Sequence, residues 1–313
     1  MNRSGIDILL SATMPPGVAE DLARHFTLHG PEVIGSPGFA DLAPRIRGMA
    51  SREPARVDAA LLEALPNLEI ISSYSAGIDN IDLDAAKRRG LVVANSSAAL
   101  DEEVADTAIA LMLMSVRRFA AAQRHVLEGN WAKGPFPLSR GLKGKRLGIV
   151  GLGHIGEAIA ARAAAFGLSI AYHNRKPKPG VAHAYYATAE ELAANSDILA
   201  VCCPGGPATL NLIDATVLRA LGPDGVVVNV SRGSVVDEDA LLAALADGAL
   251  AGAGLDVCRN EPNPRPELVG HPDIVLLPHV GSATTETRAR MGHVMRDNLL
   301  AHFAVPHSAA KEV

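Results

Sequence analysis

A glycine-rich segment near the middle of the chain has the composition and spacing of a loop that binds a dinucleotide. Its three glycines follow an apolar run, residues 147–150, and precede an alanine-rich helical pattern. In such a loop the first glycine permits a tight turn, the second lets the backbone approach a pyrophosphate, and the third lets the helix pack closely on the strand. The N-terminus of the helix then offers unpaired N–H groups to the phosphates. The predicted cofactor-binding residues of this loop are Gly151, Gly153, His154, Ile155 and Gly156.

The residues expected to face the adenosine ribose carry no carboxylate. An NAD site usually has an acid about twenty residues after the glycine loop, where it binds the ribose hydroxyls. At that place this chain has Asn174, Arg175 and Lys176. A neutral asparagine does not repel a 2′-phosphate, and the two basic side chains can donate charge-assisted hydrogen bonds to it. The segment therefore predicts NADP(H) as the preferred cofactor, with NAD(H) as the alternative. If the segment has no binding role, its two basic residues would simply form a solvated turn.

Polar side chains also follow three later predicted strands. Arg232 follows the first, Asp256 and Glu261 follow the second, and His279 follows the third. In α/β sheets the carboxyl ends of the strands present the ligand-binding groups. Each residue alone has a structural explanation, since Arg232 could cap a strand and Glu261 could be a solvated loop acid. Only together, and in this order, do they indicate an active site.

The elements that must position these residues alternate in the manner of α/β domains with parallel sheets. Strands are predicted at residues 6–10, 68–72, 91–94, 147–150, 169–172, 198–202, 226–230, 252–255 and 274–277, and helices at 17–25, 101–118 and 284–303. A chain of 313 residues exceeds the usual size of one core. We therefore predict a two-domain α/β fold. A Rossmann dinucleotide-binding domain, residues 99–283, is inserted into a flavodoxin-like parallel-sheet substrate domain formed by residues 1–98 and 284–313.

The composition excludes several classes of partner. Apolar residues make up 48% of the chain and charged residues 20%, an ordinary globular balance. With 29 basic and 34 acidic residues the formal net charge is −5, so we expect no nucleic-acid partner. The sequence has neither the apolar core of a signal peptide nor a membrane span. We therefore expect a cytoplasmic protein without a membrane partner.

The rarest side chains indicate structure more than chemistry. The three cysteines, Cys202, Cys203 and Cys258, match neither a disulfide framework nor the spacing of zinc ligands, so we expect reduced thiols and no metal. The single tryptophan, Trp131, is expected in a core or at a subunit contact rather than on a substrate.

Taken together, the glycine loop and the Arg232, Glu261 and His279 segments resemble the D-isomer-specific 2-hydroxyacid dehydrogenases. The resemblance extends over nearly the whole chain and includes residues 75–82, 203–206 and 285–288. Within that family the chain looks most like the glyoxylate and hydroxypyruvate reductases that favour NADPH.

The resemblance implies a catalytic trio. His279 would give a proton to the carbonyl oxygen of a 2-oxo acid while hydride passes from the nicotinamide to its C2 atom. Arg232 would hold the carboxylate and polarise the ketone. Glu261 would hydrogen-bond the other ring nitrogen of His279 and favour the imidazolium form. A formate dehydrogenase of the same superfamily has glutamine at this position, so the acid indicates a reaction that transfers a proton.

The resemblance also implies the remaining binding residues and a homodimer. Substrate-binding residues are Ser75, Ala76 and Gly77, together with Arg232 and His279; further cofactor-binding residues are Cys203, Pro204, Asp256 and Gly281. Two alternatives stay open. One is a reductase of the same fold that acts on a bulkier or phosphorylated 2-oxo acid. The other is a dinucleotide-sensing interaction protein, like the transcriptional corepressors with this fold.

Overall fold

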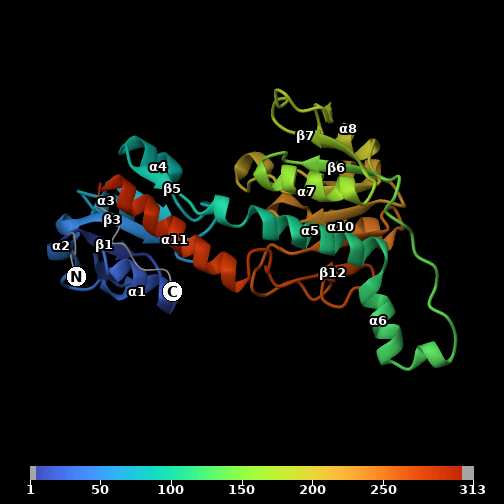
Figure 1. Ribbon diagram of the computed structural model, residues 1–313, viewed down its shortest axis with the longest axis horizontal. Coiled ribbons are helices and arrows are strands. Elements are labelled where there is room, and N and C mark those ends of the chain that lie inside the picture. The colour runs from blue at the N-terminus through green and yellow to red at the C-terminus, as the bar shows by residue number, and fades with distance from the viewer. Residues whose placement is uncertain (1–4, 305–313) are drawn as a thin grey trace. The chain divides into compact units, whose positions relative to one another are not determined.

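The computed structural model describes residues 5–304, which form two compact units (Figure 1). Unit 1 consists of Met1–Leu100 and Thr284–Val313, and unit 2 consists of Asp101–Ala283. The end of the predicted substrate domain, residues 305–313, lies outside the described residues. Each unit is an α/β fold built on one parallel sheet, so the predicted fold class is confirmed.

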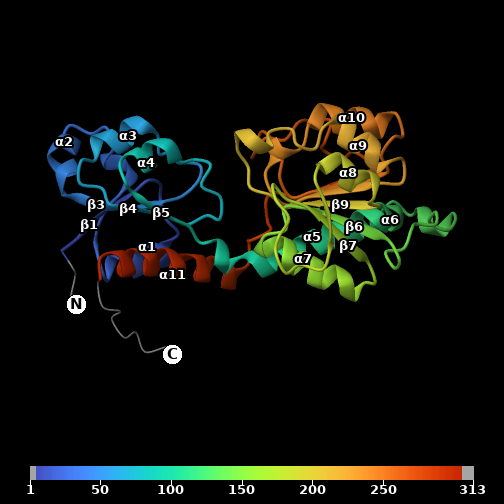
Figure 2. The ribbon, with the colours of Figure 1, turned by 90° about the horizontal axis from the view of Figure 1, so that it is seen from above.

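Unit 1 has a five-stranded sheet in the order β2-β1-β3-β4-β5, which is the flavodoxin-like order. Its strands are β1 (Asp7–Leu10), β2 (Thr27–His29), β3 (Ile46–Ser51), β4 (Ile70–Ser73) and β5 (Val92–Ala94). Its helices are α1 (Pro16–Ala23), α2 (Phe39–Leu42), α3 (Ala59–Ala64), α4 (Leu83–Arg88) and α11 (Thr285–His302), with short 3₁₀ turns at η1 (Pro31–Val33), η2 (Ala43–Arg45) and η3 (Ser97–Ala99). Helices α1 and α11 cover one face of the sheet, and α2, α3 and α4 cover the other (Figure 2).

Unit 2 has a seven-stranded parallel sheet in the order β12-β11-β10-β9-β6-β7-β8. Its strands are β6 (Arg146–Val150), β7 (Ser169–His173), β8 (Ala184–Tyr186), β9 (Ile198–Val201), β10 (Val226–Asn229), β11 (Gly252–Leu255) and β12 (Ile274–Leu276). The order reverses between β6 and β9, which is where a doubly wound sheet opens the crevice that binds its ligand.

The helices of unit 2 cover both faces of this sheet. They are α5 (Asp101–Val116), α6 (Phe119–Leu127), α7 (His154–Ala165), α8 (Ala189–Ala194), α9 (Ala215–Leu221) and α10 (Glu238–Ala246), with 3₁₀ turns at η4 (Asn130–Ala132), η5 (Pro207–Thr209) and η6 (Gly233–Val235). Helices α5 and α7 lie on one face, and α8, α9 and α10 lie on the other (Figure 2). Because helices cover both faces of the sheet, a strand such as β10 is buried along its whole length and consists mostly of β-branched residues. Such apolar runs are easy to recognise in the sequence.

The sequence prediction missed three strands, β2, β3 and β8. Strand β3 lies in the middle of the unit 1 sheet, but Arg47 and Gly48 interrupt its apolar pattern. A Cβ atom at position 48 would lie 2.5 Å from Cδ1 of Ile8 on the neighbouring strand, so a larger residue would require the Ile8 side chain to shift. A glycine inside a strand also removes a side chain from the apolar pattern, and the strand is then hard to recognise in the sequence.

The predicted long helix of residues 101–118 is shorter than expected. Helix α5 ends at Val116, and Arg118, in the left-handed region at φ 53°, turns the chain into α6. Helix α6 and the segment after it project from the rest of unit 2 (Figures 1 and 2). Trp131 lies in this projection and is 69% exposed, so of the two predicted positions the core is excluded and the subunit contact stays a prediction.

Neither a membrane span nor a metal cluster is found in the described part of the chain. Between residues 5 and 304 no helix combines the length and the apolar composition needed to cross a membrane. The same residues contain no group of three or more His, Cys, Asp or Glu side chains placed to hold a metal ion.

Candidate functional site

The three glycines of the loop between β6 and α7 serve three different physical needs. Gly151 has φ +101°, and a Cβ atom there would lie 2.6 Å from Cα of Cys203. A Cβ atom on Gly156 would lie 2.5 Å from the carbonyl oxygen of Gly151. At Gly153, by contrast, nothing lies within 4 Å of the Cβ position. The chain itself requires the first and third glycines, whereas the second leaves open the space through which a pyrophosphate would approach. The loop therefore fits a dinucleotide.

The glycine loop is tied to the ends of the two strands beside β6. The N–H of Gly151 donates to the carbonyl oxygen of His173 on β7 at 3.0 Å. The thiol of Cys202, just after β9, donates to the carbonyl oxygen of Gly151 at 3.1 Å. Cys203 lies with its backbone against Gly151, and Pro204 follows it with an exposed side chain. The structure thus brings these predicted cofactor residues to the same edge of the sheet.

Both polar atoms of the Asn174 amide group form hydrogen bonds within the protein. Its Oδ1 accepts the N–H of Leu152 at 2.7 Å, and its Nδ2 donates to the carbonyl oxygen of Leu152 at 3.5 Å. Asn174 therefore joins the end of β7 to the glycine loop. The next two side chains, Arg175 and Lys176, are exposed, so these two cations are the groups that a 2′-phosphate could meet.

His279 and Glu261 form a close pair in unit 2. The Nδ1 atom of His279 lies 2.6 Å from Oε2 of Glu261, and the other carboxylate oxygen accepts the N–H of Cys258 at 3.0 Å. With Nδ1–H donating to Glu261, the proton available for transfer sits on Nε2. Nε2 forms no hydrogen bond with any of the residues 5–304, so it can meet a substrate oxygen.

His279 and Glu261 each shift the pKa of the other. The hydrogen bond to Glu261 raises the pKa of His279 above its ordinary value, against the opposing effects of burial and of the Arg232 charge. Burial alone would raise the pKa of Glu261, but the hydrogen bond and charge of His279 hold that pKa below its ordinary value. Both shifts favour an imidazolium beside a carboxylate, and an imidazolium is the form of His279 that can act as a general acid.

Asp256 holds the turn that presents His279. It is buried, and its two carboxylate oxygens accept the N–H groups of Val280 and Gly281, each at 2.8 Å. Its carbonyl oxygen accepts the N–H of His279, also at 2.8 Å. His279 has φ 54°, a conformation that costs energy for a residue other than glycine. Asp256 thus stabilises a strained turn, whereas its expected place beside the nicotinamide stays a prediction.

Arg232 leaves β10 on a loop that packs against the loop carrying Glu261. Gly233 touches the backbone of Cys258 so closely that a Cβ atom would overlap the carbonyl carbon of Cys258. The guanidinium of Arg232 donates to the carbonyl oxygen of Ser231 at 2.9 Å. Its charge also acts on the pKa of both members of the His279–Glu261 pair. The structure therefore gathers the three predicted catalytic residues at one edge of unit 2.

Two supporting residues were missed in the sequence. Asn229 accepts the N–H of Ser231 at 3.0 Å and donates to the carbonyl oxygen of Arg232 at 3.0 Å, which fixes the loop after β10. An asparagine closing an apolar run was a readable signal for such a role. Buried Glu238 accepts the N–H of Arg259 at 2.7 Å and holds the other loop. Its acidic neighbours made it look like an ordinary residue of a helix N-terminus.

The predicted substrate-binding loop of unit 1 follows β4. Asn95 donates to the carbonyl oxygen of Ala76 at 2.8 Å, and the N–H of Ser96 donates to that of Ser75 at 3.3 Å. Within the part of the chain that the structure describes, the N–H groups of Ala76 and Gly77 donate no hydrogen bond. The loop therefore has backbone donors suited to an anionic group.

Comparison with known proteins gives consistent results. Residues 109–281 match the family model described as D-isomer specific 2-hydroxyacid dehydrogenase, NAD binding domain. The chain is 43% identical over 301 residues, 96% of each chain, to a hydroxyphenylpyruvate reductase of Plectranthus scutellarioides. It is 48% identical over 83% of each chain to a glyoxylate/hydroxypyruvate reductase A of Arabidopsis thaliana. A solved structure of an NADPH-dependent glyoxylate/hydroxypyruvate reductase from Sinorhizobium meliloti, in complex with NADP and malonate, is 42% identical, with a TM-score of 0.89 over 97% of this chain and 95% of that one.

Proposed function

Since the chain belongs to the D-isomer specific 2-hydroxyacid dehydrogenase family, we propose that it transfers hydride between NADP(H) and a small 2-oxo or 2-hydroxy acid. Reduction of glyoxylate or hydroxypyruvate is the reaction we favour. The observation that carries the proposal is the hydrogen bond between His279 and Glu261, which leaves Nε2 of a favoured imidazolium available for proton transfer. The names of the Arabidopsis and Sinorhizobium relatives support the choice of substrate.

The catalytic residues of the chain have different roles in the proposed reaction. Reduced nicotinamide, when bound, supplies the hydride that adds to C2 of the acid. His279 donates the proton on Nε2 to the carbonyl oxygen, and Glu261 stabilises the imidazolium that holds this proton. Arg232 pairs with the carboxylate and polarises the ketone. The sequence also predicts Ser75, Ala76 and Gly77 of unit 1 as substrate-binding residues, and that role stays a prediction.

The cofactor is NADP(H) in preference to NAD(H). Arg175 and Lys176 are exposed and follow β7 at the ribose-selecting place, where they carry two positive charges and no acid. The glycine loop, with Gly153 open to a ligand, holds the pyrophosphate. The NADP complex of the Sinorhizobium relative supports this preference.

A second substrate class has support of its own. The Plectranthus relative is named for an aromatic 2-oxo acid and is 43% identical to this chain over 96% of its length. Hydroxyphenylpyruvate therefore stands beside hydroxypyruvate as a candidate substrate. The ratio of kcat/KM for the two acids, with NADPH as the cofactor, decides between them.

Steady-state kinetics test the proposal. Purified protein should oxidise NADPH with glyoxylate, hydroxypyruvate or hydroxyphenylpyruvate, and His279→Ala should lower kcat by about 10²- to 10⁴-fold. His293→Ala, at an exposed position on α11, is the matched control and should leave kcat unchanged. Inactivity of the wild type across these acids with both NADPH and NADH contradicts the proposal. Tight NADPH binding without turnover would favour the corepressor-like alternative.

The proposal includes a cytoplasmic homodimer. The three cysteines, all within residues 5–304, are free thiols, which a reducing compartment maintains. The projection formed by α6 and the segment after it carries exposed apolar side chains, including Leu127 at 79% and Leu138 at 99% exposure. Such a concentration of apolar surface is typical of a subunit contact.

A further inference from the structure

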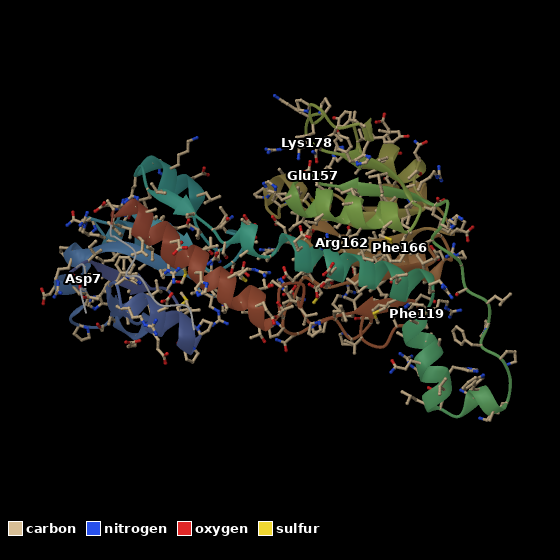
Figure 3. The ribbon with its side chains drawn as sticks, viewed as in Figure 1. Asp7, Phe119, Glu157, Arg162, Phe166 and Lys178 are labelled. Carbon is tan, nitrogen blue, oxygen red and sulfur yellow. The ribbon has the colours of Figure 1, made fainter. Side chains whose placement is uncertain are left out.

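The basic segment after β7 is anchored at both ends. At its beginning, Asn174 is hydrogen-bonded to the glycine loop through Leu152. At its end, the N–H of Lys178 donates to the hydroxyl of Tyr172 at 2.8 Å, and Nζ of Lys178 lies 2.6 Å from Oε1 of Glu157. Glu157 is in the first turn of α7, so the ion pair ties the segment to the helix that begins at the glycine loop (Figure 3).

The segment between these anchors has little conformational freedom. Lys178 lies between Pro177 and Pro179, whose rings fix their own φ angles and restrict the residue before each. The hydroxyl of Tyr185 donates to the carbonyl oxygen of Asn174 at 3.3 Å. Tyr172, which receives the N–H of Lys178, is buried in the unit. The exposed Arg175 and Lys176 thus sit on a short span held from both sides.

The ion pair between Glu157 and Lys178 does not serve the fold in any evident way. Lys178 is 35% exposed and Glu157 46% exposed, and pairs of this kind contribute little to folding stability. Glu157 also neutralises Lys178, so this lysine does not simply add a third positive charge for a phosphate. The pair does join helix α7 to the chain two residues after the second of the two exposed cations.

We propose that Glu157 and Lys178 are positioning residues for cofactor selection, which hold Arg175 and Lys176 where a 2′-phosphate is bound. This inference rests on the proposed function, because it concerns the NADP(H) site of the same reaction. A segment ordered before binding loses less entropy when the phosphate arrives, so the pair should strengthen binding of NADPH but not of NADH.

The test is calorimetric titration of the full-length protein with NADPH and with NADH, supported by kcat/KM for each cofactor. Lys178→Met and Glu157→Ala should each raise the Kd of NADPH about two- to fivefold, the range of one exposed ion pair, and leave the Kd of NADH unchanged. Lys178→Arg, which keeps the pair, should behave like the wild type. The double variant should be no worse than either single variant, since both remove the same interaction.

Asp239→Asn is the matched control, because it breaks another exposed ion pair of unit 2, Arg265–Asp239 at 2.5 Å. It should change neither Kd. Weaker NADPH binding in Lys178→Met alone, with Glu157→Ala unchanged or tighter, would make Lys178 a direct phosphate ligand and overturn the inference. Equal losses for NADPH and NADH, or no loss in either variant, also overturn it.

Cofactor affinities and turnover of the wild type distinguish a failure of this inference from a failure of the proposed function. If the wild type binds NADPH no tighter than NADH, the inference fails whichever acid is reduced. If it binds NADPH selectively but reduces none of the acids, the proposed reaction fails while the positioning role is still decided by the Kd values of the variants.

Discussion

His279 holds its proton at pH values where an unpaired imidazole would already lose it. Glu261 accepts the hydrogen bond from Nδ1 and raises the pKa of the ring, while Asp256 fixes the strained backbone from which the ring extends. Proton donation therefore depends on two carboxylates with different tasks. One controls the charge of the imidazole and the other controls its position.

Replacing Glu261 with Gln should make reduction more sensitive to rising pH. Reduction needs the imidazolium, so kcat/KM for the 2-oxo acid falls as pH rises through the pKa of His279. Because Glu261 raises that pKa, its loss should move the falling limb to lower pH. The pH profile of kcat/KM measures this shift. Glu267→Gln removes an exposed carboxylate from the same loop and should leave the profile in place; an unmoved limb in Glu261→Gln would contradict the assignment.

The residues of the site were predictable from the sequence to different degrees. Arg232, Glu261 and His279 follow recognisable strands, and the structure gathers them at one edge of the sheet. The partners of Asp256 and Asn174 were not predictable. Both side chains bind backbone groups of distant segments, and such contacts depend on how the loops fold rather than on local pattern.

At the scale of elements, the turn from β6 to α7 combines structural and functional glycines. Gly156 lets α7 approach the strand, since a Cβ atom would lie 2.5 Å from the carbonyl oxygen of Gly151. Gly153 has open space around its Cβ position and φ −93°, which alanine also adopts. The same residue type is therefore required by packing at one position and by ligand approach at the other.

Alanine at Gly156 should lower folding stability, whereas alanine at Gly153 should weaken cofactor binding. Gly156→Ala should destabilise unit 2 by about 1–3 kcal/mol through overpacking and lower the unfolding temperature by several degrees. Gly153→Ala should keep the unfolding temperature within about one degree, yet raise the Kd of NADPH tenfold or more, because the methyl group fills space that the pyrophosphate needs. Thermal scans and calorimetric titration measure both quantities. Equal stability of the two variants would refute this reading of the turn.

The elements of unit 2 were easier to predict than those of unit 1. Strands β9, β10 and β11 are short apolar runs buried on both faces, and their predicted bounds differ from the observed ones by at most one residue. Strand β3 was missed because Arg47 and Gly48 break its pattern. Strands β2 and β8 are three residues long and lack the aliphatic run that marks the equally short β5 and β12. A short or interrupted strand is recognised by its pairing with neighbouring strands, and this pairing cannot be read from the local sequence pattern.

At the scale of the whole molecule, one segment does not contribute to either core. Helix α6 has no buried residue, and the segment from Phe119 to Leu138 carries five exposed large hydrophobic side chains. The structure exposes Phe119, Val126, Leu127, Trp131 and Leu138 there. Ordering an apolar projection of this kind is favourable when another surface covers it, and a second copy of the chain provides one in the homodimer we propose.

A charge on this projection should therefore dissociate the dimer. In a two-fold symmetric dimer each substitution occurs twice, so Leu127→Glu places two carboxylates in apolar contact and should raise the dimer dissociation constant about a hundredfold or more. Sedimentation velocity at micromolar concentrations should show a dimer for the wild type and a monomer for the variant. Val269→Glu, at an apolar position that is 59% exposed elsewhere in unit 2, should stay dimeric. A monomeric wild type, or a Leu127→Glu variant that sediments as the wild type does, would exclude this projection as the dimer contact.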